Sequence, residues 1–191
     1  MIVVAKMQVE YNCLMKIVVG LGNSEEKYAK TRHNVGFVVV DELFRKLDGD
    51  ENVFFRKEKK FEAEVVRVEE VMLVKPLTFV NESGRAVRKV VDYYKVDLDS
   101  VYVVHDDLDI VLGKYKIEKG RGPKIHKGVL SVEKYLKNKK FWRVRVGIDG
   151  RAGKRDILGE DYVLGKFLKE EKVVIEKVVK TVVAELASVL K

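Results

Sequence analysis

One histidine and one aspartate, His33 and Asp106, are of the types needed to activate a water molecule. A neutral imidazole can take a proton from water near neutral pH, and a carboxylate bonded to its other nitrogen fixes the tautomer and stabilises the imidazolium. The amides of Asn23 and Asn81 both donate and accept hydrogen bonds, so they could hold a carbonyl, a ribose hydroxyl or the attacking water. These residue types indicate hydrolysis that needs no serine or cysteine nucleophile.

The spacing of these residues along the chain suggests how they could meet. Three apolar runs, 17–21, 71–74 and 101–104, lead to Asn23, to Asn81 and to His105-Asp106 respectively. A fourth group, Thr31 to Asn34, supplies His33. In open α/β sheets, ligands bind beyond the carboxyl ends of the strands, where residues distant in sequence converge. We therefore expect the four side chains to form one site.

Simpler interpretations of the same residues remain open. A single histidine after a strand is more often structural than catalytic, and Asn81 could only cap a helix. A divalent metal is a further alternative, because hard oxygen ligands follow a histidine at His105, Asp106, Asp107 and Asp109. A phosphoesterase built on that cluster would lose its activity to a chelator.

Composition limits the class of protein. The 191 residues suit one domain, and the net charge of +8 favours a polyanionic partner such as nucleic acid, although a charge-rich surface of the kind found in thermophiles is the other explanation. Cys13 is the only cysteine, which excludes an internal disulfide and indicates a reducing, cytoplasmic location. No apolar stretch approaches the roughly 20 residues of a membrane span. Residues 1–14 lack the features of a signal peptide, so we expect an N-terminal extension or an upstream start codon there, with the domain over 15–191.

The hydrophobic pattern predicts an α/β fold, in which a single domain contains a mixed, twisted β-sheet flanked by helices. Alternation of strand-like and helix-like segments indicates such a sheet, and two strands separated only by Glu69-Glu70 indicate a hairpin. Apolar residues four apart in 169–190 predict a C-terminal amphipathic helix. The expected strands are 16–21, 62–68, 71–75, 101–104, 114–117 and 142–148, and the other expected helices are 35–47, 84–94 and 128–136.

Seven blocks of sequence, in order, closely resemble the bacterial-type peptidyl-tRNA hydrolase family. The resemblance extends from Met15 almost to the end of the chain. The first two blocks read Lys-Ile-Val-Val-Gly-Leu-Gly-Asn and Tyr-Ala-Lys-Thr-Arg-His-Asn-Val-Gly. All seven blocks lie at 16–23, 28–36, 75–84, 103–109, 126–128, 143–148 and 162–167.

The resemblance implies hydrolysis of the ester that joins a peptide to the 3′ ribose of tRNA, which recycles tRNA from stalled translation. By position in the blocks, His33 is similar to the family's general base and Asp106 to its supporting carboxylate. Asn23 is similar to the residue that helps to distinguish N-blocked peptidyl-tRNA from aminoacyl-tRNA. The resemblance implies no metal or cofactor, and we expect a monomer whose partners are tRNA and peptidyl-tRNA. It also implies contacts with the tRNA end, the peptide or a phosphate for Tyr28, Phe79, Asn81, His126, Lys127 and Arg145.

The chain departs from the family pattern near the expected substrate contacts. Lys127 stands where an asparagine is usual, and Pro123 and Ile125 replace glycines that would leave a loop mobile. Glu118 stands where relatives often have a basic residue linked to the tRNA 5′ phosphate, which leaves Arg145 as the expected phosphate contact. Lys116, Lys119 or Arg121 could replace the lost charge. An RNA-binding relative with weak or no hydrolase activity is therefore the alternative, although such a module would not need the base and its carboxylate.

Overall fold

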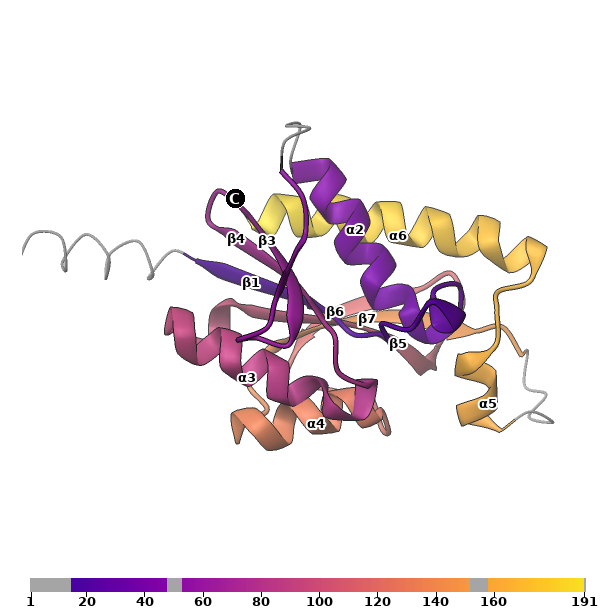
Figure 1. The fold of residues 1–191 in the computed structure, drawn as a ribbon. Coiled ribbons are helices and arrows are strands. Elements are labelled where there is room, and N and C mark those ends of the chain that lie inside the picture. Colours follow the sequence, from indigo (N-terminus) through magenta and orange to yellow (C-terminus); the bar gives the residue numbers. More distant parts are fainter. Residues whose placement is uncertain (1–14, 48–52, 152–157, 191) are drawn as a thin grey trace, which may run out of the picture.

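Seven strands form one mixed sheet in the computed structural model, which describes residues 15–47, 53–151 and 158–190 (Figure 1). The strand order is β2-β3-β4-β1-β5-β7-β6, and the expected N-terminal extension, 1–14, lies outside the described residues. Strands β4, β1, β5 and β7 are parallel to their neighbours within the centre of the sheet, whereas both edges are antiparallel. The strands are β1 (Lys16–Gly20), β2 (Arg56–Glu58), β3 (Ala63–Val68), β4 (Val71–Pro76), β5 (Val101–Val111), β6 (Tyr115–Lys119) and β7 (Trp142–Asp149).

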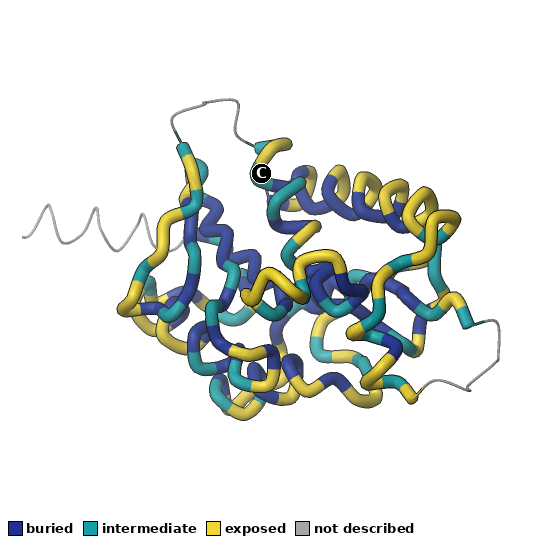
Figure 2. Tube along the Cα trace, turned by 45° about the vertical axis from the view of Figure 1, so that its right-hand side comes forward, coloured by how far each residue is buried: buried dark blue, intermediate teal, exposed yellow. Residues whose placement is uncertain are grey.

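Helices cover both faces of this sheet (Figure 1). Helices α2 (Val35–Leu47) and α6 (Lys169–Val189) pack together on one face, and α3 (Ser83–Tyr94) and α4 (Lys127–Leu136) pack together on the other. The predicted α/β class, the mixed sheet, the β3–β4 hairpin and the amphipathic C-terminal helix are confirmed. Figure 2 shows the buried residues of α6 recurring along the side that faces the body of the protein. Among the described helices, none combines the length and the apolar character that a membrane crossing requires.

Two apolar layers hold the sheet between these helix pairs. Because successive side chains of a strand point to opposite faces, Val18 packs in the layer with α2 and α6, whereas Val19 packs in the layer with α3 and α4. Both valines are fully buried. Parallel central strands that are covered on both faces read as continuous apolar runs, which is why the sequence predicted them well.

Strand β5 is longer than the predicted segment 101–104. It pairs with β1 only as far as Val104, opposite Gly20, but it continues to pair with β7 through Asp107. His105 and Asp106 therefore lie inside a strand, beyond the end of β1, and not in a loop after the strand. The extra length exposes one edge of β5 at the carboxyl end of the sheet, where the candidate site lies. Strand β2 and the short helix α5 (Gly159–Leu164) were not predicted.

The first turn of α2 lies directly against the ends of two strands. A Cβ atom added to Gly36 would lie 2.5 Å from the carbonyl oxygens of both Leu21 and Val104. A glycine is required there because the backbones approach too closely for any side chain. This contact holds the start of α2, and with it the residue pair His33-Asn34, against the carboxyl ends of β1 and β5.

Replacing Gly36 with alanine should destabilise the protein by about 1–3 kcal/mol, because the added methyl group overfills a closed contact. Helix propensity alone would predict the opposite, a gain of up to about 1 kcal/mol. The free energy of unfolding in urea measures the difference, and Val38→Ala, at an exposed position of the same helix, is the control. Stabilisation by Gly36→Ala would show that the helix does not need this close approach.

Candidate functional site

His33 and Asp106 meet at the carboxyl end of the sheet. His33 lies in the short 3-10 helix η2 (Arg32–Asn34), and its Nδ1 is 2.7 Å from Oδ1 of Asp106 on β5. The Asp106 side chain is 2% exposed, whereas the His33 side chain is 14% exposed. The carboxylate is therefore buried behind an imidazole that still reaches solvent. The predicted pair exists, and it has the geometry of a base held by a carboxylate.

The charge of Asp106 determines the protonation of the pair. Burial alone would raise the pKa of Asp106, but the charges and hydrogen bonds of His126 and His33 hold that pKa well below its usual range. Burial also acts on His33 and lowers its pKa, but the charge and hydrogen bond of Asp106 outweigh it and raise that pKa above its ordinary value. Since the carboxylate only accepts hydrogen bonds, Nδ1 of His33 carries the hydrogen, and Nε2 of the neutral ring keeps a free lone pair.

Arg32 anchors the segment that carries His33. Its guanidinium is buried, with Nη2 2.6 Å from Oε2 of Glu171 on α6 and the Tyr162 ring 4.0 Å away. Its backbone N–H donates to the carbonyl oxygen of Gly165 at 3.0 Å. Sequence analysis missed this role of Arg32, although Arg32 and Tyr162 both stand inside resembling blocks. Through these contacts with Arg32, the short helix α5 helps to fix the position of the neighbouring residue, His33.

Asn23 links the ends of three segments. Its backbone N–H donates to Oδ1 of Asn34 at 3.0 Å, and Nδ2 of Asn34 donates back to the Asn23 carbonyl at 2.9 Å. Its side-chain Oδ1 accepts the backbone N–H of Val80 at 3.1 Å. Asn23, in the loop that follows β1, is thus bonded to Asn34, next to His33, and to Val80, which lies between Phe79 and Asn81.

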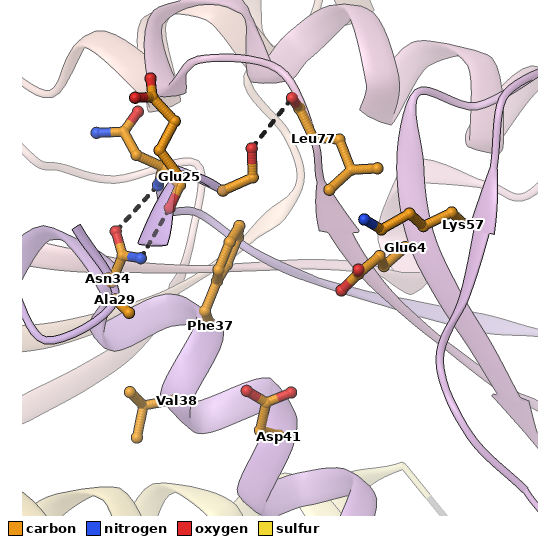
Figure 3. A pocket seen from close by; sticks show the side chains of 11 residues that line it. Glu25, Ala29, Asn34, Phe37, Val38, Asp41, Lys57, Glu64 and Leu77 are labelled. Atoms are coloured by element: carbon orange, nitrogen blue, oxygen red, sulfur yellow. Dashed lines mark hydrogen bonds between the residues drawn. The ribbon is translucent and has the colours of Figure 1, made fainter. Parts of the chain in front are cut away.

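A pocket of about 280 Å³ lies beside the Asn23–Asn34 pair (Figure 3). Figure 3 shows Phe37, Val38 and Asp41 of α2 on one side, and Lys57 of β2 and Glu64 of β3 on the other. The Ser24 hydroxyl, which also lines the pocket, donates to the Leu77 carbonyl oxygen at 3.3 Å. Neither His33 nor Asp106 lines this pocket.

The three other predicted contacts of this region differ in exposure. Phe79 is 61% exposed and Asn81 is exposed, while Val80 between them is buried. Tyr28 is half-buried, with the ammonium of Lys27 4.9 Å from its ring centroid. Phe79, Asn81 and Tyr28 are thus all open to a ligand.

Both ring nitrogens of His126 are bonded within the protein, and its expected contact with the substrate stays a prediction. Its Nε2 is 2.9 Å from Oδ1 of Asp106, and its Nδ1 accepts the backbone N–H groups of Gly128 and Val129 at 3.1 and 3.2 Å. The side chain is 5% exposed. Both ring nitrogens are therefore engaged, and the residue caps the N-terminus of α4 while it contacts the carboxylate.

Arg145 is also bound by side chains of the protein, and its expected contact with a phosphate stays a prediction. Its Nε is 2.7 Å from Oδ2 of Asp107, and its Nη1 is 2.7 Å from Oε2 of Glu118. Glu118 is the residue that stands where a basic residue was expected. The guanidinium is 9% exposed and packs against the backbone of Gly122. A phosphate would have to displace a carboxylate to bind here, because two acidic partners already neutralise the charge.

Lys127 is exposed, and its Nζ is 2.5 Å from Oε1 of Glu160 on α5. The substitution of lysine for the usual asparagine thus connects the start of α4 to α5. Both side chains are more than half exposed, so the ion pair is weak and a ligand can replace it at little cost.

The metal alternative does not form as predicted. Asp107 binds Arg145, Asp109 accepts the backbone N–H of Lys124, and Nδ1 of His105 donates to the carbonyl oxygen of Asp106. Within the described ranges, the ligand atoms that do converge are those of His33, Asp106 and His126, within 4.8 Å. These atoms already bond to one another, and a cation there would have to replace the hydrogens of both imidazoles. This donor set fits a hydrogen-bonded cluster better than a metal centre.

Comparison with known proteins identifies the family. Residues 17–191 match the family described as peptidyl-tRNA hydrolase. Among curated relatives, a peptidyl-tRNA hydrolase of Lactiplantibacillus plantarum is 46% identical over 161 residues, which cover 82% of this chain and 83% of the relative. The chain belongs to the peptidyl-tRNA hydrolase family.

Other members of the peptidyl-tRNA hydrolase family agree in sequence and in fold. The enzyme named peptidyl-tRNA hydrolase in Geobacillus kaustophilus is 42% identical, over 86% of this chain and 87% of the relative. A crystal structure of peptidyl-tRNA hydrolase from Acinetobacter baumannii superimposes with a TM-score of 0.80 and 28% identity, covering 91% of this chain and 87% of that one. The predicted family is confirmed, and its hydrolase activity is favoured over the binding-module alternative.

Replacing Asp106 with asparagine should lower the pKa of His33 below its ordinary value. Burial of the ring would remain, but the charge that now outweighs it would be gone. NMR titration of the His33 ring protons measures this shift, and Asp109→Asn, at an exposed carboxylate of the same strand, is the matched control. A pKa of His33 that stays raised in Asp106→Asn would show that the carboxylate does not control the base.

Proposed function

We propose that this protein hydrolyses the ester between a peptide and the 3′ ribose of tRNA, with a water molecule activated by His33. The observation that carries the proposal is the 2.7 Å contact between Nδ1 of His33 and the buried Asp106 carboxylate, with the imidazole still open to solvent. An ester is activated relative to an amide, so one positioned water and one base suffice. No covalent intermediate is needed.

The proposed reaction proceeds in two proton transfers. Nε2 of His33 takes a proton from water as the water oxygen attacks the ester carbonyl, which gives a tetrahedral intermediate and an imidazolium. The Asp106 carboxylate stabilises that imidazolium through the Nδ1–H bond. The intermediate then breaks its bond to the 3′ oxygen of the ribose, and the imidazolium returns the proton to that oxygen. The products are tRNA with its terminal hydroxyl and a peptide with a free carboxylic acid, which loses its proton to water at neutral pH.

Asn23 supplies a reason for discrimination between blocked and free amino groups. Because its Oδ1 accepts the Val80 N–H, its amide is oriented with Nδ2 free to donate to a ligand. A peptidyl ester presents an amide carbonyl, which accepts that hydrogen bond. An unblocked aminoacyl ester presents an ammonium group, which is itself only a donor. We propose that Asn81 and Phe79, which flank Val80, contact the same end of the substrate.

The partner is tRNA, and we propose that the protein acts as a monomer in the cytoplasm. The net charge of +8 on this chain attracts the negatively charged phosphates of tRNA. Since Arg145 is held by Asp107 and Glu118, the exposed Lys116 and Arg121 are better placed to bind the phosphates. Lys119 is less available, because its ammonium is 2.6 Å from Asp99.

His33→Ala should lower kcat by about 10²- to 10⁴-fold, the usual contribution of a general base, with little change in tRNA binding. The assay follows release of N-acetyl-amino acid from N-acetyl-aminoacyl-tRNA, with unblocked aminoacyl-tRNA as the comparison. Near wild-type turnover by His33→Ala would reject the proposed base. Full activity in EDTA is expected, whereas loss of activity that a divalent ion restores would favour a metal-dependent mechanism.

Asn23→Asp should reduce cleavage of the blocked substrate by about 10- to 100-fold and narrow its preference over the unblocked one. A carboxylate can still accept the Val80 N–H, but it replaces the free donor with an acceptor that suits an ammonium group. The ratio of kcat/KM values for the two substrates is the measurement, and Ser24→Ala, at the neighbouring position, is the control. An unchanged ratio would exclude Asn23 from substrate discrimination.

A further inference from the structure

We propose that His126 is a positioning residue of the reaction, which holds the Asp106 carboxylate and shares it with His33 without touching the substrate. The proposal rests on the function proposed above. It replaces the expectation that His126 contacts the substrate directly. Its basis is a set of hydrogen bonds that leaves His126 only one possible arrangement of its ring hydrogen.

The tautomer of His126 follows from the helix that it caps. Nδ1 accepts two backbone N–H groups from the first turn of α4, those of Gly128 and Val129, so it cannot carry a hydrogen. The hydrogen of the neutral ring must then be on Nε2, which lies 2.9 Å from Oδ1 of Asp106. His126 is therefore a donor to the carboxylate, fixed in that role by the backbone of α4.

The same oxygen of Asp106 serves both imidazoles. Oδ1 accepts from His33 at 2.7 Å and from His126 at 2.9 Å, and the two rings lie 5.1 Å apart between centroids. The hydrogen bond from His126 fixes the carboxylate in one orientation. It also partly neutralises the negative charge of Oδ1, the atom that His33 contacts. Without it, the full charge of Asp106 would act on His33, and the proton on the imidazolium would be held more tightly. His126 thus keeps the base weak enough to return its proton.

Among the described residues, the titratable groups around this carboxylate come from four elements. His33 approaches from η2, His126 from the start of α4, and His105 precedes Asp106 on β5. The His105 ring packs edge-on against His126 at 4.9 Å, and burial, together with His126, lowers the pKa of His105 to about 3. His105 therefore stays neutral at every pH at which the enzyme would be assayed. On β7, Arg145 is nearby but is bound to Asp107.

A space-conserving pair of substitutions separates the two functions of the ring. In His126→Asn, the side-chain oxygen replaces Nδ1 and asparagine remains a good helix cap, but the donor to Asp106 is lost. In His126→Gln, the side-chain nitrogen can replace Nε2, whereas the cap is lost. The first variant tests the proposal, and the second reports what loss of the cap alone does to activity and thermal stability.

For His126→Asn we expect a kcat about 10-fold lower near pH 6, an unchanged KM and an acid limb of the kcat profile that moves to higher pH. The direction follows because the neutral ring of His33 is the active form, and a raised pKa delays its appearance as pH increases. His126→Gln should keep the wild-type limb and lose thermal stability. Asp106→Asn should lower the pKa of His33, whereas His126→Asn should raise it. The direction of the shift therefore distinguishes loss of the carboxylate from loss of the His126 hydrogen bond.

A higher KM in His126→Asn with an unchanged kcat and acid limb would overturn the proposal, because that result is expected of a direct substrate contact. An unchanged profile in all respects would also overturn it. If His126→Asn does not fold, an acid limb in His126→Gln that moves upward would contradict the proposal, and a wild-type limb would support it. His33→Ala separates this result from a failure of the proposed function. If His33 is not the base, His33→Ala keeps its activity; if only the role of His126 is wrong, His33→Ala still loses activity.

Discussion

The structure of this site depends on keeping one buried carboxylate ionised. Removing a carboxylate from water is costly unless other groups supply the hydrogen bonds that water would have made. For Asp106 the two imidazoles do this through one oxygen, His33 from the segment before α2 and His126 from the start of α4. The carboxylate in return fixes the ring of His33 and strengthens it as a base. Orientation and basicity are therefore consequences of a single hydrogen-bonded cluster.

The fold brings that cluster together by three local devices. Strand β5 extends past β1, which places Asp106 beyond the carboxyl end of β1 while it still pairs with β7. Gly36 allows α2 to start in contact with the strand ends, and the buried Arg32 fastens the turn before it to Glu171 of α6. Gly128 has a comparable function at α4, since a Cβ there would lie 2.7 Å from the Val80 side chain. The chemistry of the site thus depends on contacts that contain no reactive group.

Most of the fold could be predicted from the sequence because the hydrophobic pattern is strong. The apolar runs of β1 and β4, the valine- and isoleucine-rich β7 and the four-residue spacing in α6 indicate their own structure. The end of β5 could not be predicted, since His105, Asp106 and Asp107 interrupt the apolar run while β7 continues to pair with them. Strand β2 and helix α5 are short, with three and six residues, and they are stabilised by tertiary contacts that no local pattern encodes.

The site was predictable in its residue types but only partly in their roles. His33, Asp106 and Asn23 carry recognisable chemistry, and their positions in the resembling blocks indicated their association. The role of His126 depends on which groups bind its two nitrogens, and that information exists only in three dimensions. The same holds for Arg145. Its sequence position indicates a phosphate contact, but in the structure it forms an ion pair with Glu118, which stands where a basic residue was expected.

The most direct test compares two pKa values in the unmodified protein. One is the pKa of His33 from NMR titration of its ring protons, and the other is the midpoint of the acid limb of kcat/KM for N-acetyl-aminoacyl-tRNA. If His33 is the base, the two values coincide, and both lie above the ordinary value for histidine. A rate that stays constant while His33 becomes protonated, or that follows a different group, would contradict the account.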